Sequence, residues 1–261
     1  MHSEEMADQP PAHTDRRRAG AFGYAAENYH RYRPRYPKAL IDSLVKADGE
    51  RALDVGAGTG IASMQLRGIG VNVLALEPDP RMARVAADHG IPIEVTTFED
   101  WTASGRLFDL VVFAQSFHWV DPDVALPKAR SILRPGGRLA LLSNRVTPLS
   151  PERSTLDEAY VGILDAPARP AIDAVHNNEL MTTVQRYGYS IERRSVTEHL
   201  HYTADDWVNM MLTYSNVATL STATQSKLSS RLRQRIGHAG VDAQNEAVAV
   251  TCKPSGDPVV R

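Results

Sequence analysis

The sequence predicts an α/β fold, with one doubly wound, mostly parallel sheet and helices on both of its faces. Short apolar segments typical of buried strands alternate with helical segments from residue 51 to residue 143. This alternation is typical of parallel strands joined by right-handed helical crossovers. In addition, the first expected strand, Arg51–Val55, leads through a glycine-dense turn into an expected helix, Ile61–Arg67. Such a corner presents unpaired backbone N–H groups at a helix N-terminus, which favours a nucleotide or another anion.

The expected strands are short apolar runs. The run over residues 71–76 is nearly continuous in apolar residues, as a strand buried on both faces should be, and it ends at Glu77. The expected strands cover residues 51–55, 71–76, 93–96, 108–113, 138–143, 190–201 and 247–252.

Several expected helices begin at recognisable capping residues. Asp79-Pro80 and Asp121-Pro122 each combine an acidic N-cap with a proline in the first turn. Pro127 falls inside the second of these helices and should either kink it or delay its start. Two further expected helices cover residues 38–46 and 156–164. A third begins at Thr203, where Asp206 completes a capping-box pattern, and a fourth includes Leu228, Leu232 and Ile236.

Composition excludes several classes of protein. With 29 basic and 31 acidic residues, the formal net charge is -2, so neither a basic nucleic-acid footprint nor an acidic disordered chain is expected. A single cysteine, Cys252, excludes an internal disulfide framework, and the histidines lack metal-ligand spacing. Because neither a signal peptide nor a run of ~18 apolar residues is evident, we expect a cytoplasmic protein without a membrane span.

The flanking segments differ from the strand–helix repeat. Residues 1–20 are polar and are expected to form a disordered tail, and residues 254–261 a second tail. Residues 21–37 hold four tyrosines among arginines. They form either a helix packed on the domain or a lid that closes over a ligand. Residues 145–187 are rich in prolines and are expected to form an insertion over the strand tips.

The spacing of the glycine-rich turn favours one class of nucleotide over another. The pattern is Gly56-x-Gly58-x-Gly60, with Asp54 two positions before the first glycine. A dinucleotide-binding turn needs a third small residue where Ile61 stands, so a nicotinamide oxidoreductase is disfavoured. Glu77 follows Gly60 by 17 residues, at the tip of the second expected strand, where a carboxylate can accept hydrogen bonds from both ribose hydroxyls.

Taken in order, the segments 53–60, 74–79, 98–100, 108–121 and 133–141 resemble the successive motifs of class I S-adenosylmethionine-dependent methyltransferases. The segment from Phe22 to Pro37, together with Gln115-Ser116-Phe117-His118-Trp119-Val120-Asp121, resembles the bacterial small-molecule branch related to trans-aconitate methyltransferase. The resemblance implies a single domain over residues 21–253 with a seven-stranded Rossmann-like sheet. The last strand would be antiparallel and inserted beside the sixth. It also implies S-adenosylmethionine as cofactor and S-adenosylhomocysteine as product.

The resemblance further implies roles for individual residues. The glycine turn would run beneath the methionine and ribose parts of the cofactor, and Asp54 would order this turn and help to hold the amino group. Glu77 would bind the ribose, and Phe98 would present its backbone N–H to the adenine. Thr97 stands where many relatives carry an acidic residue that accepts from the adenine amine. The implied cofactor-binding residues are Tyr24, Tyr29, Arg33, Asp54, Gly56, Ala57, Gly58, Gly60, Glu77, Pro78, Phe98, Glu99 and Gln115.

The implied chemistry asks little of acid–base groups. A sulfonium donor carries an activated methyl group and leaves as a neutral molecule, so direct displacement depends on alignment and exclusion of water. A base is needed only if the acceptor must lose a proton. His118 is the candidate for that role, or else shapes the pocket wall. We expect a small-molecule acceptor, with oxygen favoured. The alternatives are an RNA or protein methyltransferase and a non-catalytic cofactor-binding partner subunit.

Overall fold

The computed structural model describes residues 25–164 and 174–255. The strands are β1 (Arg51–Val55), β2 (Asn72–Leu76), β3 (Ile93–Glu94), β4 (Phe108–Ala114), β5 (Leu133–Ser150), β6 (Tyr189–Tyr202) and β7 (Val241–Pro254). The α-helices are α2 (Ala26–Tyr32), α3 (Lys38–Asp42), α4 (Ile61–Arg67), α5 (Pro80–Asp88), α6 (Pro122–Ile132), α7 (Arg153–Asp157), α8 (Asn178–Arg186), α9 (Ala204–Leu212), α10 (Ser215–Ala218) and α11 (Thr222–Ile236). Short 3₁₀ turns lie at Phe117–Trp119, Glu158–Tyr160 and Ala174–His176.

All strands belong to one seven-stranded sheet in the order β3-β2-β1-β4-β5-β7-β6. The pairs from β3 to β5 are parallel, whereas β7 is antiparallel to both β5 and β6. The sheet confirms the expected fold, including the last strand inserted beside the sixth. The strand order reverses between β1 and β4, and ligands of open α/β sheets bind at the carboxyl ends of strands at such a point.

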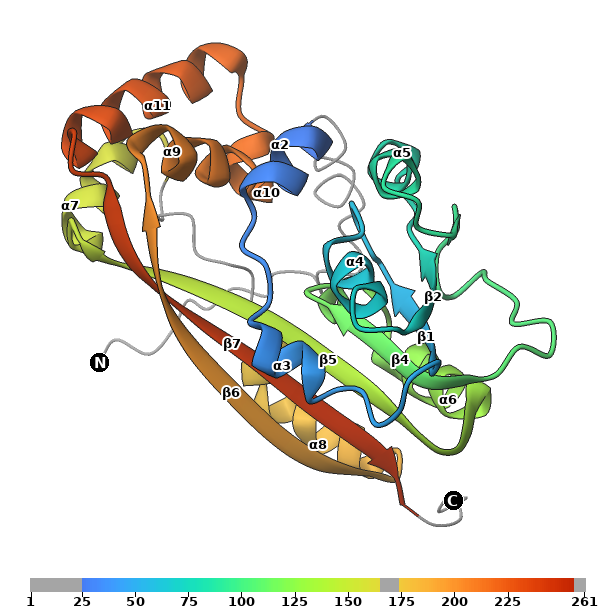
Figure 1. Ribbon diagram of the computed structural model, residues 1–261. Coiled ribbons are helices and arrows are strands. Elements are labelled where there is room, and N and C mark those ends of the chain that lie inside the picture. Colours follow the sequence, from blue (N-terminus) through green and yellow to red (C-terminus); the bar gives the residue numbers. More distant parts are fainter. Residues whose placement is uncertain (1–24, 165–173, 256–261) are drawn as a thin grey trace, which may run out of the picture.

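Both faces of the sheet carry helices. Leu40, Ile41 and Leu44 of the α3 region and Ala62 and Leu66 of α4 pack on one face. On the other face, α6 and α8 contribute Ala125, Leu126, Ala129, Ile132 and Val184 to a second apolar cluster. A third cluster unites α9 and α11 with the far ends of β5 and β7, through residues such as Trp207, Met210, Leu228, Leu232 and Val146. Figure 1 shows these helices at the opposite end of the long strands from β1 and β2.

The antiparallel strands are longer than expected. β5 runs to Ser150 instead of ending at residue 143, so the expected start of the insertion, at residue 145, falls inside this strand. The extension is stabilised by pairing with β7, which continues from Ser143↔Val248 to Ser150↔Asp242. The polar residues Arg145 and Thr147 interrupt the apolar run and hide this strand in the sequence. β7 in turn ends only at Pro254, within the expected C-terminal tail.

The expected helix caps are present. Asp79 accepts a hydrogen bond from the N–H of Arg81 at 2.9 Å, and Asp121 one from the N–H of Asp123 at 2.9 Å. Thr203 accepts from the N–H of Asp206 at 3.1 Å.

Other element boundaries differ from those expected. Helix α6 begins at Pro122, so Pro127 lies inside it and does not delay its start. α3 ends at Asp42 rather than near residue 46, and β3 covers two residues only. The helix expected over 156–164 is instead α7 followed by a 3₁₀ turn.

The expected N-terminal tail over residues 1–20, Tyr24 and residues 256–261 lie outside the described residues. In the part of the chain that is described, no helix is long and apolar enough to cross a membrane.

Candidate functional site

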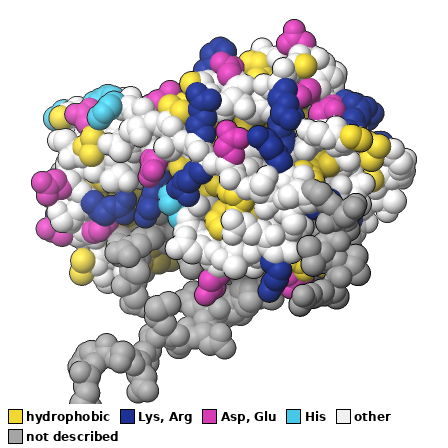
Figure 2. Space-filling view, turned by 90° about the horizontal axis from the view of Figure 1, so that it is seen from below, with side chains coloured by type: hydrophobic (Ala, Val, Ile, Leu, Met, Phe, Trp, Pro, Cys, Tyr) yellow, Lys and Arg dark blue, Asp and Glu magenta, His cyan; other side chains and the backbone are white. Residues whose placement is uncertain are grey.

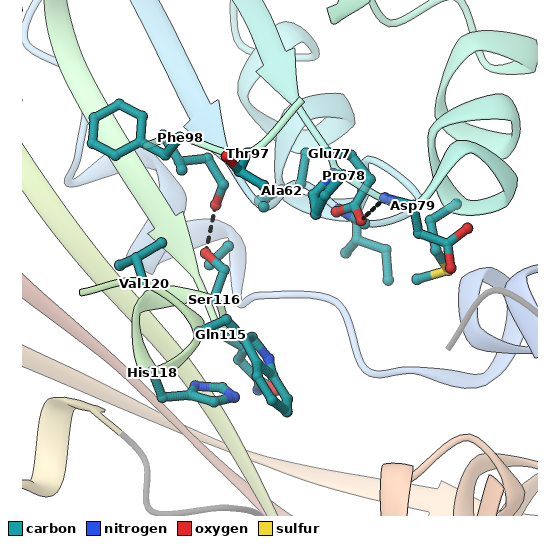
Figure 3. A pocket seen from close by; sticks show the side chains of 18 of the residues that line it. Ala62, Glu77, Pro78, Asp79, Thr97, Phe98, Gln115, Ser116, His118 and Val120 are labelled. Carbon is teal, nitrogen blue, oxygen red and sulfur yellow. Dashed lines mark hydrogen bonds between the residues drawn. The ribbon is translucent and has the colours of Figure 1, made fainter. Parts of the chain in front are cut away.

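A cavity of about 820 Å³ lies at the carboxyl ends of β1, β2 and β4, where the strand order reverses. Figure 3 shows Glu77, Pro78 and Asp79 on one side of it, Thr97 and Phe98 on a second, and Gln115 and His118 on a third. The residues expected at the site that line this cavity are Tyr29, Arg33, Gly56, Ala57, Gly58, Glu77, Pro78, Phe98, Glu99, Gln115 and His118. Asp54 and Gly60 are not among the lining residues, and Tyr24 is outside the described chain.

The glycine turn has a backbone that other residues adopt only with strain. Gly56, Gly58 and Gly60 have φ angles of +65°, +58° and +80°. A Cβ atom on Gly56 would lie 2.7 Å from the Cβ of Ser116, so the turn needs glycine where the β4 tip approaches it. A Cβ on Gly60 would lie 3.1 Å from the Cβ of Ala86. Gly60 therefore lets α5 pack against the turn, and it does not itself line the cavity.

The Glu77 carboxylate is held in place by backbone N–H groups. Its Oε2 accepts from the N–H of Gly58 at 2.8 Å, and its Oε1 from the N–H of Asp79 at 2.9 Å. Burial raises the pKa of Glu77 to about 7, more than these hydrogen bonds lower it. Because each carboxylate oxygen has two lone pairs, both retain capacity for a ligand hydroxyl. This end of the cavity is therefore suited to a vicinal diol.

Asp54 supports the turn from below the cavity. It is completely buried, and its Oδ2 accepts from the hydroxyl of Ser63 in α4 at 2.6 Å. Burial raises the pKa of Asp54 to about 6. Within the described residues its Oδ1 has no hydrogen-bond partner. The Asp54 carboxylate thus contacts α4 and is not among the residues that line the cavity, which fits a role in ordering the turn.

A turn over residues 97–100 forms the next wall. The N–H of Trp101 donates to the carbonyl of Thr97 at 3.1 Å, which makes this segment one helical turn. Lys128 of α6 donates to the carbonyls of Phe98 at 2.6 Å and Glu99 at 2.9 Å. No described group accepts from the N–H groups of Phe98 or Glu99, as is usual in the first turn of a helix. Phe98 and Glu99 both line the cavity, and two unpaired N–H donors suit the ring nitrogens of a base.

The tip of β4 and the end of β5 form the third wall. Gln115 has a φ of +55°, and its side chain donates to the carbonyl of Asn144 at 2.9 Å. Asn144 donates in turn to the carbonyls of Pro34 at 3.2 Å and Arg35 at 3.3 Å. Asn144 therefore joins the lid segment to the strand tips. Sequence reasoning missed this role, because its only local sign is an amide that follows the apolar run of the fifth strand.

Arg33 reaches the cavity from the end of α2. Its Nε donates to the hydroxyl of Thr213 at 2.8 Å and its Nη2 to the carbonyl of Thr213 at 3.1 Å. The guanidinium lies 4.8 Å from the centre of the Tyr29 ring and 3.8 Å from that of Tyr214. Burial raises the pKa of Tyr29. Thr213 and Tyr214 were not recognised from the sequence, where their region has no motif.

His30 fixes α2 to the glycine turn. Its Nδ1–H donates to the carbonyl of Thr59 at 3.1 Å, and its ring stacks on His89 at 4.1 Å. Nε2 accepts from Arg35 at 3.3 Å. Burial lowers the pKa of His30, so the neutral ring is the form that docks α2.

His118 belongs to the 3₁₀ turn that follows β4. It lines the cavity together with Trp119, and the centres of the two rings are 4.8 Å apart. Within the described ranges, no group of three histidine, cysteine, aspartate or glutamate side chains is arranged to hold a metal ion.

Comparison with known proteins identifies the family. A family model described as a methyltransferase domain matches residues 29–211. An uncharacterized methyltransferase of Mycobacterium tuberculosis is 32% identical over 233 residues, which cover 88% of this chain and 91% of the relative. A ubiquinone biosynthesis O-methyltransferase of Xanthomonas axonopodis pv. citri is 27% identical over 161 residues, or 58% of this chain and 67% of the relative.

Solved structures share the fold. One from Anaeromyxobacter dehalogenans, proposed to be a type II methyltransferase, superimposes with a TM-score of 0.62 at 24% identity over 85% of this chain and 98% of that chain. The phosphoethanolamine N-methyltransferase 2 of Haemonchus contortus, solved with S-adenosylhomocysteine, has a TM-score of 0.50 at 18% identity, over 93% of this chain and 59% of that chain. Because the family model spans well over half of the sequence, the chain belongs to the class I S-adenosylmethionine-dependent methyltransferases.

Proposed function

We propose that the protein transfers a methyl group from S-adenosylmethionine to a small molecule, with oxygen as the favoured acceptor atom. The observation that carries this proposal is the convergence of three kinds of group on one cavity of about 820 Å³. They are the diol-binding carboxylate of Glu77, the N–H groups of the 97–100 turn and the guanidinium of Arg33. A nucleoside linked to an amino acid needs all three.

The residues present fit the cofactor. Gly56 and Gly58 line the cavity and carry no Cβ atom, so a ligand can lie close to the backbone of the turn there. Glu77 would hold the ribose, and Pro78, Phe98 and Glu99 would contact the adenine. Gln115, Tyr29 and Arg33 would surround the methionine part, with Tyr24 as a further lid residue. Asp54 and Gly60 would support the turn without contact to the cofactor.

When bound, the cofactor supplies a methyl group activated on a sulfonium. The protein's contribution is then to align the acceptor and to exclude water, and correct placement of two reactants can lower a barrier by ~7–11 kcal/mol. The domain over residues 21–253 provides this placement through its lid at 21–37, which Asn144 ties to the strand tips. His118 takes a proton from an acceptor hydroxyl or shapes the wall against which the acceptor lies.

Four observations favour a small acceptor. The segments at Phe22–Pro37 and 115–121 resemble the branch related to trans-aconitate methyltransferase, and a 27% identical relative is named as an O-methyltransferase. The net charge is -2. On the face in Figure 2, Lys and Arg side chains are interspersed with Asp and Glu rather than gathered in a stripe, which disfavours RNA.

Transfer of labelled methyl from S-adenosylmethionine to a panel of hydroxylated and carboxylated metabolites tests the proposal. Transfer that is lost in Glu77→Gln and kept in Glu179→Gln, an exposed carboxylate of α8, supports it. Transfer only to RNA or protein refutes the small-molecule acceptor. Binding of S-adenosylhomocysteine without transfer to any acceptor class favours the non-catalytic partner subunit instead.

A further inference from the structure

The charges around the cavity are unevenly distributed. Its lining includes five carboxylates, which belong to Glu77, Asp79, Glu99, Asp100 and Asp121. Two arginines also line it. Arg81 is paired with Asp79 at 2.7 Å. Within the described residues, no carboxylate lies within ion-pair distance of Arg33. Arg33 is half-buried. A partly desolvated cation without an acidic partner favours an anion, so Arg33 is the place in this cavity where an anionic ligand group would be stabilised most.

The hydrogen bonds that hold the Arg33 guanidinium decide which of its edges remains available to a ligand. The carbonyl and the hydroxyl of Thr213 take Nε and one hydrogen of Nη2. Two of the five N–H donors are therefore used, and the end edge formed by Nη1 and Nη2 keeps the other three. The rings of Tyr29 and Tyr214 also contact the guanidinium, with centres 4.8 and 3.8 Å from its carbon. A guanidinium held along one edge and packed against two aromatic rings is prepared for a bidentate carboxylate on its free edge.

Thr213 is itself rigidly placed. It is the C-cap of α9, is 1% exposed, and its hydroxyl donates to the carbonyl of Met210 at 2.6 Å. Because that hydrogen is engaged, the oxygen can only accept from Arg33. The carbonyl of Thr213 also lies at the C-terminal, negative end of the α9 dipole, which favours a cation there. Figure 1 shows α2 beside α9 and α10, far from both in sequence.

We propose that Thr213 and Tyr214, at the corner between α9 and α10, are positioning residues that aim Arg33 at the carboxylate of the cofactor's methionine part. The proposal rests on the proposed function, because it takes the cavity to hold this cofactor. It assigns the corner a task in binding that both residues perform through the guanidinium of Arg33. A carboxylate on the acceptor has the same chemistry and is the competing occupant of the same edge.

Two ligands separate these possibilities. S-Adenosylhomocysteine carries the methionine-derived carboxylate, whereas 5′-methylthioadenosine shares its adenine, ribose and sulfur and lacks the amino acid. Calorimetry should show that Thr213→Val lowers the affinity for S-adenosylhomocysteine about tenfold, which equals about 1.4 kcal/mol. The affinity for 5′-methylthioadenosine should change less than about twofold. Thr213→Ser keeps the hydroxyl and should restore the affinity. Tyr214→Leu should act like Thr213→Val, and Tyr214→Phe, which keeps the ring face, should not.

Thr219 supplies the matched control. It caps the C-terminus of α10, its hydroxyl also donates to a carbonyl three residues back at 3.3 Å, and it is exposed and does not contact Arg33. Thr219→Val should leave both affinities unchanged. Equal weakening of the two ligands by Thr213→Val would show that Thr213 is merely structural and overturn the proposal. Unchanged binding of S-adenosylhomocysteine would overturn it in favour of an acceptor carboxylate. A wild-type protein that binds neither ligand would refute the proposed function itself. If Thr213→Val fails to fold, Tyr214→Leu against Tyr214→Phe carries the same test, and equal binding of S-adenosylhomocysteine by these two variants would overturn the proposal.

Discussion

Glu77, which we propose holds the ribose, should make the affinity for the cofactor depend on pH. Burial raises its pKa to about 7 in the free protein. At this pKa the carboxyl is about one-tenth ionised at pH 6 and about nine-tenths ionised at pH 8. Ribose hydroxyls donate to the ionised form and therefore stabilise it. The affinity for S-adenosylhomocysteine should consequently rise about tenfold from pH 6 to pH 8 and level off above.

The same shift fixes the sign of the effect on stability. A carboxyl whose pKa is raised in the folded state contributes stability below its unfolded pKa of 4.5 and loses it as the pH rises through about 7. The free protein should thus lose stability from this group between these values. Bound S-adenosylhomocysteine offsets the loss, so the ligand-induced rise in Tm should be larger at pH 8 than at pH 6.

Glu77→Gln isolates this residue. The amide places an NH₂ group against the N–H of either Gly58 or Asp79, which now donate to the carboxylate at 2.8 and 2.9 Å. Hydrogen bonds to a charged group are worth about 1.5–3 kcal/mol, so the affinity at pH 8 should fall ~10–150-fold. Calorimetry across pH 6–8 should give a much flatter profile for the variant than for the wild type. A flat wild-type profile, or an equal slope in Glu77→Gln, would refute the assignment.

Three further changes probe other parts of the cavity. Gly56→Ala should destabilise the fold by about 1–3 kcal/mol in urea unfolding, because its Cβ would meet that of Ser116 at 2.7 Å and φ is +65°. Lys128→Met removes the ammonium group that donates to the carbonyls of the 97–100 turn. In calorimetry it should lower the affinities for S-adenosylhomocysteine and 5′-methylthioadenosine equally, by about tenfold. His118→Ala should lower kcat about 10²-fold or more if His118 is the base, with unchanged S-adenosylhomocysteine affinity.

Each of these changes has its own comparison. Gly49 has a similar φ of +75° with nothing within 4 Å of an added Cβ, so Gly49→Ala measures backbone strain alone. An equal loss in both glycine variants would show that contact with Ser116 does not matter. Lys227→Met removes an exposed ammonium of α11 and should change neither affinity. A higher KM with unchanged kcat in His118→Ala would assign His118 to the pocket wall.

Local sequence patterns predicted much of the parallel half of the sheet. The turn at Gly56–Gly60, the acid at the tip of β2 and the caps at Asp79 and Asp121 each depend on neighbours a few residues away, so the sequence contains the whole signal. The apolar runs of β1, β2 and β4 are equally local, because strands buried on both faces need no partner to be recognised. These features account for the adenine and ribose end of the cavity.

Contacts between distant segments were not predictable in this way. Arg33 and Thr213 are 180 residues apart, and Asn144 lies 110 residues from Pro34. Nothing near Lys128 indicates that its ammonium covers the carbonyls of a turn some 30 residues earlier. The extension of β5 was missed for a related reason. Past residue 144 the strand is buried on one face only, so Val146 alternates with polar residues and the apolar run disappears.

The two ends of the cavity are therefore held by different parts of the molecule. The end that we propose for the adenine and ribose rests on turns that follow parallel strands, whereas the end proposed for the methionine part depends on α2, α9 and the long antiparallel strands. Asn245 of β7 donates to Asn144 at 3.1 Å, and both side chains are buried, so the register of β7 against β5 helps to set where the lid lies. The α9–α11 cluster packs on these same strands through Val146 and Ala243. A shift of β5 and β7 would move Thr213 and Asn144 together relative to the glycine turn. Such a shift would affect binding of the amino-acid part of the cofactor more than binding of the nucleoside.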